Sequence, residues 1–184
     1  MINLTTERMC HAGYPRPKEG EGFGGLFQNG FYINYLHGLN YLCKKYITKN
    51  TKMLELGCFY GVSSLLFSEH SDDVTCVDIM LYPEMQKIIE NTKINFHKSD
   101  SIEFLNSCDN ETYDLIYIDT THDYSRTKEE ITLAYNKIKL NGYLAGHDYN
   151  TDGVSNAILS IFKYPDIEIF LDSSWLIQKN YNLI

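Results

Sequence analysis

The chain has 184 residues, of which 43% are hydrophobic and 22% are charged, and this composition indicates one folded domain rather than a disordered chain. Sixteen basic and 24 acidic residues give a net charge of −8, which argues against binding to nucleic acid or to a membrane surface. The five cysteines are scattered with no C-x-x-C pair, and neither a signal peptide nor a membrane span is expected, so we predict reduced thiols and a cytoplasmic protein.

The first thirty residues differ from the rest of the chain. They hold Pro15, Pro17 and, before Gly30, five of the twelve glycines, which is typical of irregular structure. We therefore predict an N-terminal arm over residues 1–30, either a frayed terminus or a lid over a site. The folded domain is expected over residues 31–184.

Beyond the arm, short apolar runs alternate with helical patterns. The first helix is predicted over 31–47, where apolar residues recur at helical spacing. Buried strands are predicted at 53–56, 74–77, 94–97, 113–119 and 143–146. Helices are predicted between them around 62–66, 84–91, 101–106 and 131–138, and after them over 154–162. The fourth of these helices is expected to end at Asn141-Gly142, a C-cap signal.

The end of the chain breaks this alternation. Two strand-like runs at 167–171 and 175–178 are joined by three residues, too few for a helix, so they predict a hairpin. The whole pattern predicts an α/β fold of the Rossmann-like, doubly wound type, with a mostly parallel seven-stranded sheet and a C-terminal antiparallel hairpin. In such sheets ligands bind at the carboxyl ends of the strands.

A glycine turn follows the first of the buried strands. Gly57 permits a tight turn and close approach to a ligand, and Gly61 is expected to let the next helix pack near the strand. Asp78 ends the second strand about 20 residues later, where an acidic residue binds the hydroxyls of a ribose. Dinucleotide enzymes place a glycine where this turn has Phe59, so an NAD-dependent Rossmann oxidoreductase is the less favoured interpretation.

The pattern E-x-G-x-x-x-G over residues 55–61 resembles motif I of class I S-adenosylmethionine (SAM) methyltransferases. Two later segments, DLIYIDTTHDY at 114–124 and GYLAGHDY at 142–149, resemble the signature of small-molecule methyltransferase family 24, which is related to macrocin-type sugar O-methyltransferases. The resemblance covers roughly residues 50–180.

This resemblance implies roles for single residues. The methionine part of SAM would be surrounded by Glu55, Gly57, Cys58, Tyr60, Gly61 and Ser63. Asp78 would bind the ribose, with Ile79 beside it. Asp100 and Ser101 would flank the adenine, although Asp100 also stands where a helix N-cap is expected. Asp119 would lie below the sulfonium.

Transfer to a hydroxyl group also needs a proton acceptor. His147 and His122 both follow strand ends on the cofactor side, so each is a candidate base. In the related sugar O-methyltransferases, acidic residues at two such places bind a divalent cation, and Asp119 and Asp148 match them; their oxygen ligands would favour Mg²⁺. Thr121 departs from that pattern, because it stands where the family signature has a second aspartate.

The sequence therefore predicts a SAM-dependent methyltransferase that acts on a hydroxyl of a small polar acceptor, such as a sugar or sugar nucleotide. The alternatives are the Rossmann oxidoreductase and a catalytically idle SAM-binding module. No nucleic-acid or membrane partner is expected, and a homo-oligomer is left open.

Overall fold

A computed structural model describes residues 27–28, 31–32, 37–162 and 165–180 of the chain. The predicted arm over 1–30 lies almost entirely outside the described residues. Its last part contributes Phe27–Gln28 (β1), which pairs antiparallel with Phe31–Tyr32 (β2).

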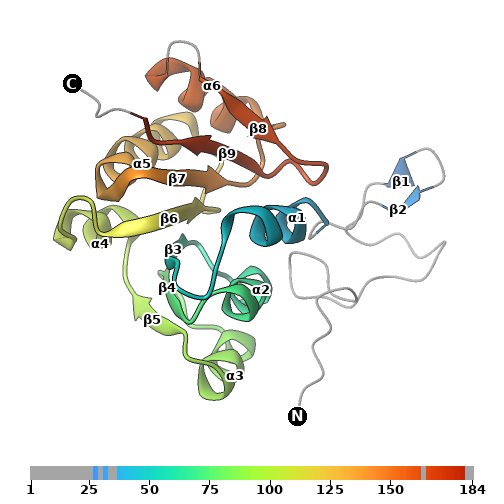
Figure 1. The fold of residues 1–184 in the computed structure, drawn as a ribbon, viewed down its shortest axis with the longest axis vertical. Coiled ribbons are helices and arrows are strands. Elements are labelled where there is room, and N and C mark those ends of the chain that lie inside the picture. The colour runs from blue at the N-terminus through green and yellow to red at the C-terminus, as the bar shows by residue number, and fades with distance from the viewer. Residues whose placement is uncertain (1–26, 29–30, 33–36, 163–164, 181–184) are drawn as a thin grey trace.

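A seven-stranded sheet forms the centre of the fold (Figure 1), with the strand order β5-β4-β3-β6-β7-β9-β8. Its strands are Lys52–Leu56 (β3), Asp73–Asp78 (β4), Asn95–Lys98 (β5), Tyr113–Ile118 (β6), Ile138–Gly146 (β7), Ile167–Ile169 (β8) and Trp175–Gln178 (β9). All neighbouring pairs from β5 to β7 are parallel, whereas β9 runs antiparallel to both β7 and β8. This confirms the predicted mostly parallel Rossmann-like sheet and its terminal hairpin.

Helices cover both faces of the sheet. The helices are His37–Tyr46 (α1), Val62–His70 (α2), Pro83–Asn91 (α3), Ser101–Ser107 (α4), Tyr124–Lys137 (α5) and Asp152–Ile161 (α6). One buried core joins the sheet to α1, α2 and α3, and a second joins it to α4, α5 and α6. Because both faces are covered, the central strands read as continuous apolar runs rather than alternating ones.

Two predicted helix boundaries are wrong. The helix expected over 31–47 begins only at His37, because Phe31–Tyr32 pairs with β1 instead. The helix expected to stop at Asn141-Gly142 stops at Lys137, and β7 starts at once with Ile138 paired to Tyr113. Asn141 still adopts the left-handed conformation (φ 68°), but it does so at the irregular stretch within β7.

The register of the sheet brings the sequence motifs together. Leu56 pairs with Val77 on one side and Ile118 on the other, and Ile118 pairs with Gly146. Each next residue in these parallel strands therefore lies in the same row, at the carboxyl edge. Those residues are Gly57, Asp78, Asp119 and His147.

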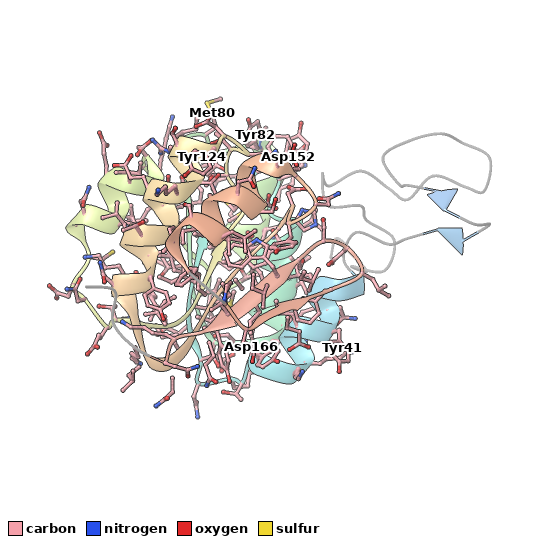
Figure 2. All side chains as sticks on the ribbon, turned by 90° about the horizontal axis from the view of Figure 1, so that it is seen from above. Tyr41, Met80, Tyr82, Tyr124, Asp152 and Asp166 are labelled. Atoms are coloured by element: carbon pink, nitrogen blue, oxygen red, sulfur yellow. The ribbon has the colours of Figure 1, made fainter. Side chains whose placement is uncertain are left out.

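Figure 2 shows residues that follow this edge, Met80 after β4, Tyr124 after β6 and Asp152 after β7, along one side of the molecule. Tyr41 and Asp166 lie toward the opposite side of that view. Within the described ranges, no helix is long and apolar enough to cross a membrane.

Candidate active site

The glycine turn is held between β4 and β6. Gly57 has φ 83°, and a Cβ on it would lie 2.1 Å from the carbonyl oxygen of Asp119, so only glycine fits there. Gly61 also has a positive φ, but its close neighbour is Met85 of α3, at 2.4 Å from a Cβ. The expectation that Gly61 makes room for the strand is therefore wrong: it makes room for α3.

Hydrogen bonds to the side chain of Asp78 connect the glycine turn to the end of β4. Its Oδ2 accepts hydrogen bonds from the backbone N–H groups of Cys58 (3.1 Å) and Phe59 (2.9 Å), and its Oδ1 accepts one from Met80 (3.0 Å). The residue expected to bind a ribose thus lies beside the turn expected to bind the rest of the cofactor.

Glu55 lies in the protein interior and not at the surface of the site. Its side chain is fully buried and accepts hydrogen bonds from the hydroxyls of Ser63 and Ser64 and from the thiol of Cys76. Burial raises the pKa of Glu55 to about 7, although the two serine hydrogen bonds act in the opposite direction. Glu55 and Ser63 therefore contact each other, and they fix the start of α2 behind the turn.

An apolar rim surrounds Asp78. The ring of Phe59 stacks on Tyr60 with centroids 3.9 Å apart, and both rings contact Tyr82 edge-on. The side chains of Ile79, Met80 and Leu81 are exposed next to them. A patch of exposed apolar side chains beside a polar anchor is typical of a ligand site.

Asp100 caps α4, as its position in the sequence suggested. One carboxylate oxygen accepts from the backbone N–H groups of Ile102 and Glu103, and the other pairs with Arg126 at 2.5 Å. Ser101 is buried and donates its hydroxyl to Glu130.

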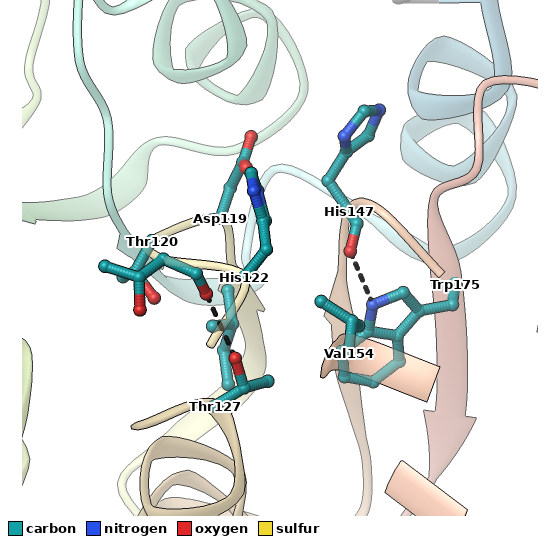
Figure 3. A pocket seen from close by; sticks show the side chains of 9 residues that line it. Asp119, Thr120, His122, Thr127, His147, Val154 and Trp175 are labelled. Atoms are coloured by element: carbon teal, nitrogen blue, oxygen red, sulfur yellow. Dashed lines mark hydrogen bonds between the residues drawn. The ribbon is translucent and has the colours of Figure 1, made fainter. Parts of the chain in front are cut away.

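A small pocket lies where β6 and β7 end (Figure 3), with an empty volume of about 220 Å³ that includes space open to solvent. Asp119, Thr120 and His122 line one side, and His147 lines the other. Figure 3 shows the side chains of Asp119, His122 and His147 pointing to the same side, away from Val154 and Trp175. The indole of Trp175 donates to the carbonyl of His147 (3.0 Å), which fixes the backbone there.

Asp148 connects the two histidines. Its Oδ2 lies 2.7 Å from Nε2 of His122 and 3.1 Å from Nδ1 of His147. The side chain of His122 is half exposed, whereas that of His147 is buried. Asp148 itself has φ 57°, a left-handed conformation that turns its carboxylate back toward β6.

Charges are concentrated around the pocket. Burial lowers the pKa of His147, but the hydrogen bond with Asp148 and the nearby Asp119 outweigh burial and raise it above its usual range. Burial also raises the pKa of Asp119, against the opposing effect of His147. His147 therefore holds its proton at neutral pH, and His122 is the histidine that faces solvent.

The two carboxylates predicted as metal ligands do come together, with a third group that the sequence did not assign to a metal. Ligand atoms of Asp119, His122 and Asp148 all lie within 4.8 Å of one another. Thr121, the departure from the family signature, lines the same pocket and accepts a hydrogen bond from Thr127 through its carbonyl.

Sequence reasoning missed three residues near the site. They are Ser64, Arg126 and Glu130. Ser64 ends the segment of the glycine turn but has no role in the family resemblance, and Arg126 and Glu130 resemble an ordinary i, i+4 surface pair. The signal for Glu130 was its spacing on α5, because it lies four residues before Ala134 and therefore on the buried face of the helix.

Comparison with solved structures shows the fold. An rRNA methylase from Streptococcus thermophilus superposes with a TM-score of 0.63 and 11% identity over 81% of this chain and 98% of the other. The N-methyltransferase NodS from Bradyrhizobium japonicum, solved with S-adenosylhomocysteine, superposes with a TM-score of 0.55 and 16% identity over 78% of this chain and 83% of NodS. The YcgJ protein from Bacillus subtilis superposes with a TM-score of 0.52 and 14% identity, and the match covers 60% of this chain and 49% of YcgJ.

No curated protein matches the sequence. The family described as a methyltransferase domain, methyltransferase family 24, matches residues 54–149, from the middle of β3 to the end of the Asp148 turn. This match covers more than half of the chain and includes the glycine turn, Asp78, Asp119, His122 and Asp148. The chain therefore belongs to this family of class I methyltransferase domains.

Proposed function

We propose that this protein uses SAM to methylate a hydroxyl group of a small polar acceptor such as a sugar or sugar nucleotide. The observation that carries the proposal is the 2.7 Å contact between His122 and Asp148. Through this contact the carboxylate of Asp148 orients the imidazole ring of His122. The ring lies where the parallel strands end, beside the proposed cofactor site.

The residues of the glycine turn and of the β4 end fit SAM. Gly57 lets the turn lie directly against the carbonyl of Asp119, where any side chain would clash, so the turn and the residue expected below the sulfonium lie side by side. Asp78 offers carboxylate oxygens to a ribose diol, and the exposed Ile79, Met80 and Leu81 offer an apolar surface to an adenine ring. SAM supplies a methyl group on a positively charged sulfur, which is already activated for displacement. Solved NodS contains S-adenosylhomocysteine, the product of that transfer.

The chain itself has to orient the acceptor and take up a proton. As the new C–O bond forms and the methyl–sulfur bond breaks, the hydroxyl proton passes to the ring nitrogen of His122 that does not face Asp148. Asp148 orients this ring and stabilises the imidazolium that results, as a carboxylate does for a catalytic histidine.

His147 and Asp119 support the site in other ways. His147 is buried and shares Asp148 with His122, so it fixes the carboxylate and adds positive charge behind it. Asp119 lies between the glycine turn and the pocket, where its side chain would face the sulfonium. Of the two expected bases, the exposed His122 is therefore the better placed.

A bound divalent cation is the second candidate for activating the acceptor. Asp119, His122 and Asp148 could supply two carboxylates and an imidazole, a set that suits Mg²⁺ or Mn²⁺. Their closest pair, however, is already at direct hydrogen-bond distance, which favours the proton-acceptor arrangement. Activity that is lost in EDTA and restored by Mg²⁺ would favour the cation instead.

The proposal of a small acceptor rests on this chain's own surface. Some structural neighbours are named as rRNA or N-methyltransferases, so similarity of fold does not select the acceptor atom. The net charge of −8 opposes an RNA backbone, and the described pocket beside His122 is small, about 220 Å³ including space open to solvent.

The test is transfer of a labelled methyl group from SAM to a panel of sugars, sugar nucleotides and other alcohols. His122→Gln is expected to lower single-turnover transfer by about 10²- to 10⁴-fold, because the proton acceptor is lost. His97→Gln is the matched control, since His97 lies on β5, where its ring contacts Asn95 and Phe104 and not the pocket residues. Equal rates for both variants would remove His122 from the mechanism.

A further inference from the structure

A buried hydrogen-bonded cluster joins two strand-end loops on the side of the sheet covered by α5. Its centre is Glu130, whose side chain is fully buried. The carboxylate accepts from the hydroxyls of Ser101 and Thr120 (2.5 Å to the latter) and from Nε of Arg126 (3.2 Å). A buried carboxylate is stable only when such partners surround it.

Arg126 completes the connection. Its Nη2 donates to Asp100 (2.5 Å) and to the hydroxyl of Ser101 (2.8 Å), while its Nε faces Glu130. Arg126 and Glu130 are one helical turn apart on α5, so they present a rigid pair to both loops. One pair on α5 therefore holds residues from the end of β5 and from the end of β6.

Both loops border the proposed cofactor site. Asp100 and Ser101 are the residues expected beside the adenine. Thr120 follows Asp119, whose carbonyl fills the space beside Gly57 and whose N–H donates to Leu56 at 2.8 Å. A shift of Thr120 would therefore move Asp119 against the glycine turn.

We propose that Glu130 and Arg126 are positioning residues that set the spacing between the adenine end and the methyl end of the cofactor site. The inference rests on the proposed use of SAM. Neither residue needs to touch the cofactor; they act through Ser101, Asp100 and Thr120. Their loss would misalign two parts of one ligand, so affinity for the whole ligand should fall.

The test is calorimetric titration of S-adenosylhomocysteine into wild type and four variants. Glu130→Gln replaces one accepting carboxylate oxygen by an amide that cannot accept, and Thr120→Val removes a hydroxyl that donates to Glu130. Each is expected to weaken binding by about tenfold or more. Thr120→Ser keeps the hydroxyl and should restore near-wild-type affinity. Ala134→Gly, on a buried position of α5 away from both loops, is the control for general helix destabilisation.

The outcomes separate positioning from stability. The inference is supported if Glu130→Gln and Thr120→Val bind weakly while Thr120→Ser and Ala134→Gly bind normally. Variants are compared where their melting temperatures are similar. If Ala134→Gly loses as much affinity as they do, or if they bind normally, the inference is overturned. If Glu130→Gln does not fold, the comparison of Thr120→Val with Thr120→Ser still decides. Wild-type protein that does not bind at all would contradict the proposed function and not this cluster.

Discussion

Glu55 stands where the methyltransferase motif has its acidic residue, but its side chain lies in the core and not beside the cofactor site. An acidic residue two positions before Gly57 was expected to contact the cofactor, but the carboxyl lies in the core and binds Ser63, Ser64 and Cys76. Because the charged form is poorly solvated there, its pKa rises to about 7 from the ordinary value of 4.5.

This pKa shift predicts a pH-dependent stability. The folded state keeps the Glu55 proton up to about pH 7, whereas the unfolded chain loses it near pH 4.5. The stabilisation is therefore fully present below pH 4.5 and is lost as pH rises to about 7, by about 3 kcal/mol in total. Glu55→Gln cannot ionise, so the wild-type free energy of unfolding should fall relative to the variant over this range. Urea unfolding at several pH values measures it, and parallel curves would refute the assignment.

Gly57 illustrates a residue that no other can replace. Gly57→Ala places a methyl group 2.1 Å from the Asp119 carbonyl in a left-handed conformation, so the turn must move. We expect loss of S-adenosylhomocysteine binding and destabilisation by about 2 kcal/mol or more.

The matched control is Gly142→Ala, whose Cβ would meet the Asp114 carbonyl at 2.6 Å near the start of the parallel part of β7, away from the site. It should destabilise the fold and leave binding intact. Binding lost equally in both variants would mean that Gly57 matters only for folding.

At the scale of elements, strands and most helices follow directly from apolar patterning. Four of the five parallel strands were predicted to within one residue at each end, because buried strands in a doubly covered sheet are short apolar runs. The fifth, β7, starts five residues earlier than predicted, at Ile138. The boundaries of α1 and α5 could not be predicted in this way. They depend on Phe31–Tyr32 pairing with β1 and on Ile138 pairing with Tyr113, which are contacts between distant or irregular segments.

The terminal hairpin also secures α1. The buried carboxylate of Asp172 accepts from the backbone N–H of Leu39 (2.7 Å) in the first turn of α1 and from Ser174 (3.0 Å) in the hairpin turn. Asp172→Ala should therefore cost about 1–3 kcal/mol of unfolding free energy, since both donors lose their partner. Asp166→Ala, at an exposed position before β8, should change stability by less than about 0.5 kcal/mol. Urea titration compares the two, and equal values would show that Asp172 does not hold α1.

For the whole molecule, the sheet register explains why so much of the site was predictable. Asp78 ends its strand, and Gly57, Asp119 and His147 directly follow theirs, so parallel pairing places the four motif residues in one row. The sequence could not reveal the contacts across that row. That Asp148 pairs with His122, or that Glu130 reaches Ser101 and Thr120, depends on side-chain directions that only the folded chain fixes.

The most direct test of the central claim is a calorimetric titration of the wild-type protein with S-adenosylhomocysteine and, separately, with NAD. We predict saturable binding of S-adenosylhomocysteine and none of NAD, because Phe59 stands where a dinucleotide site needs glycine. At a hundred times its dissociation constant the ligand should also raise the unfolding free energy by about 2.7 kcal/mol. Absence of binding to S-adenosylhomocysteine would contradict the proposed use of SAM, and binding of NAD in its place would revive the oxidoreductase interpretation.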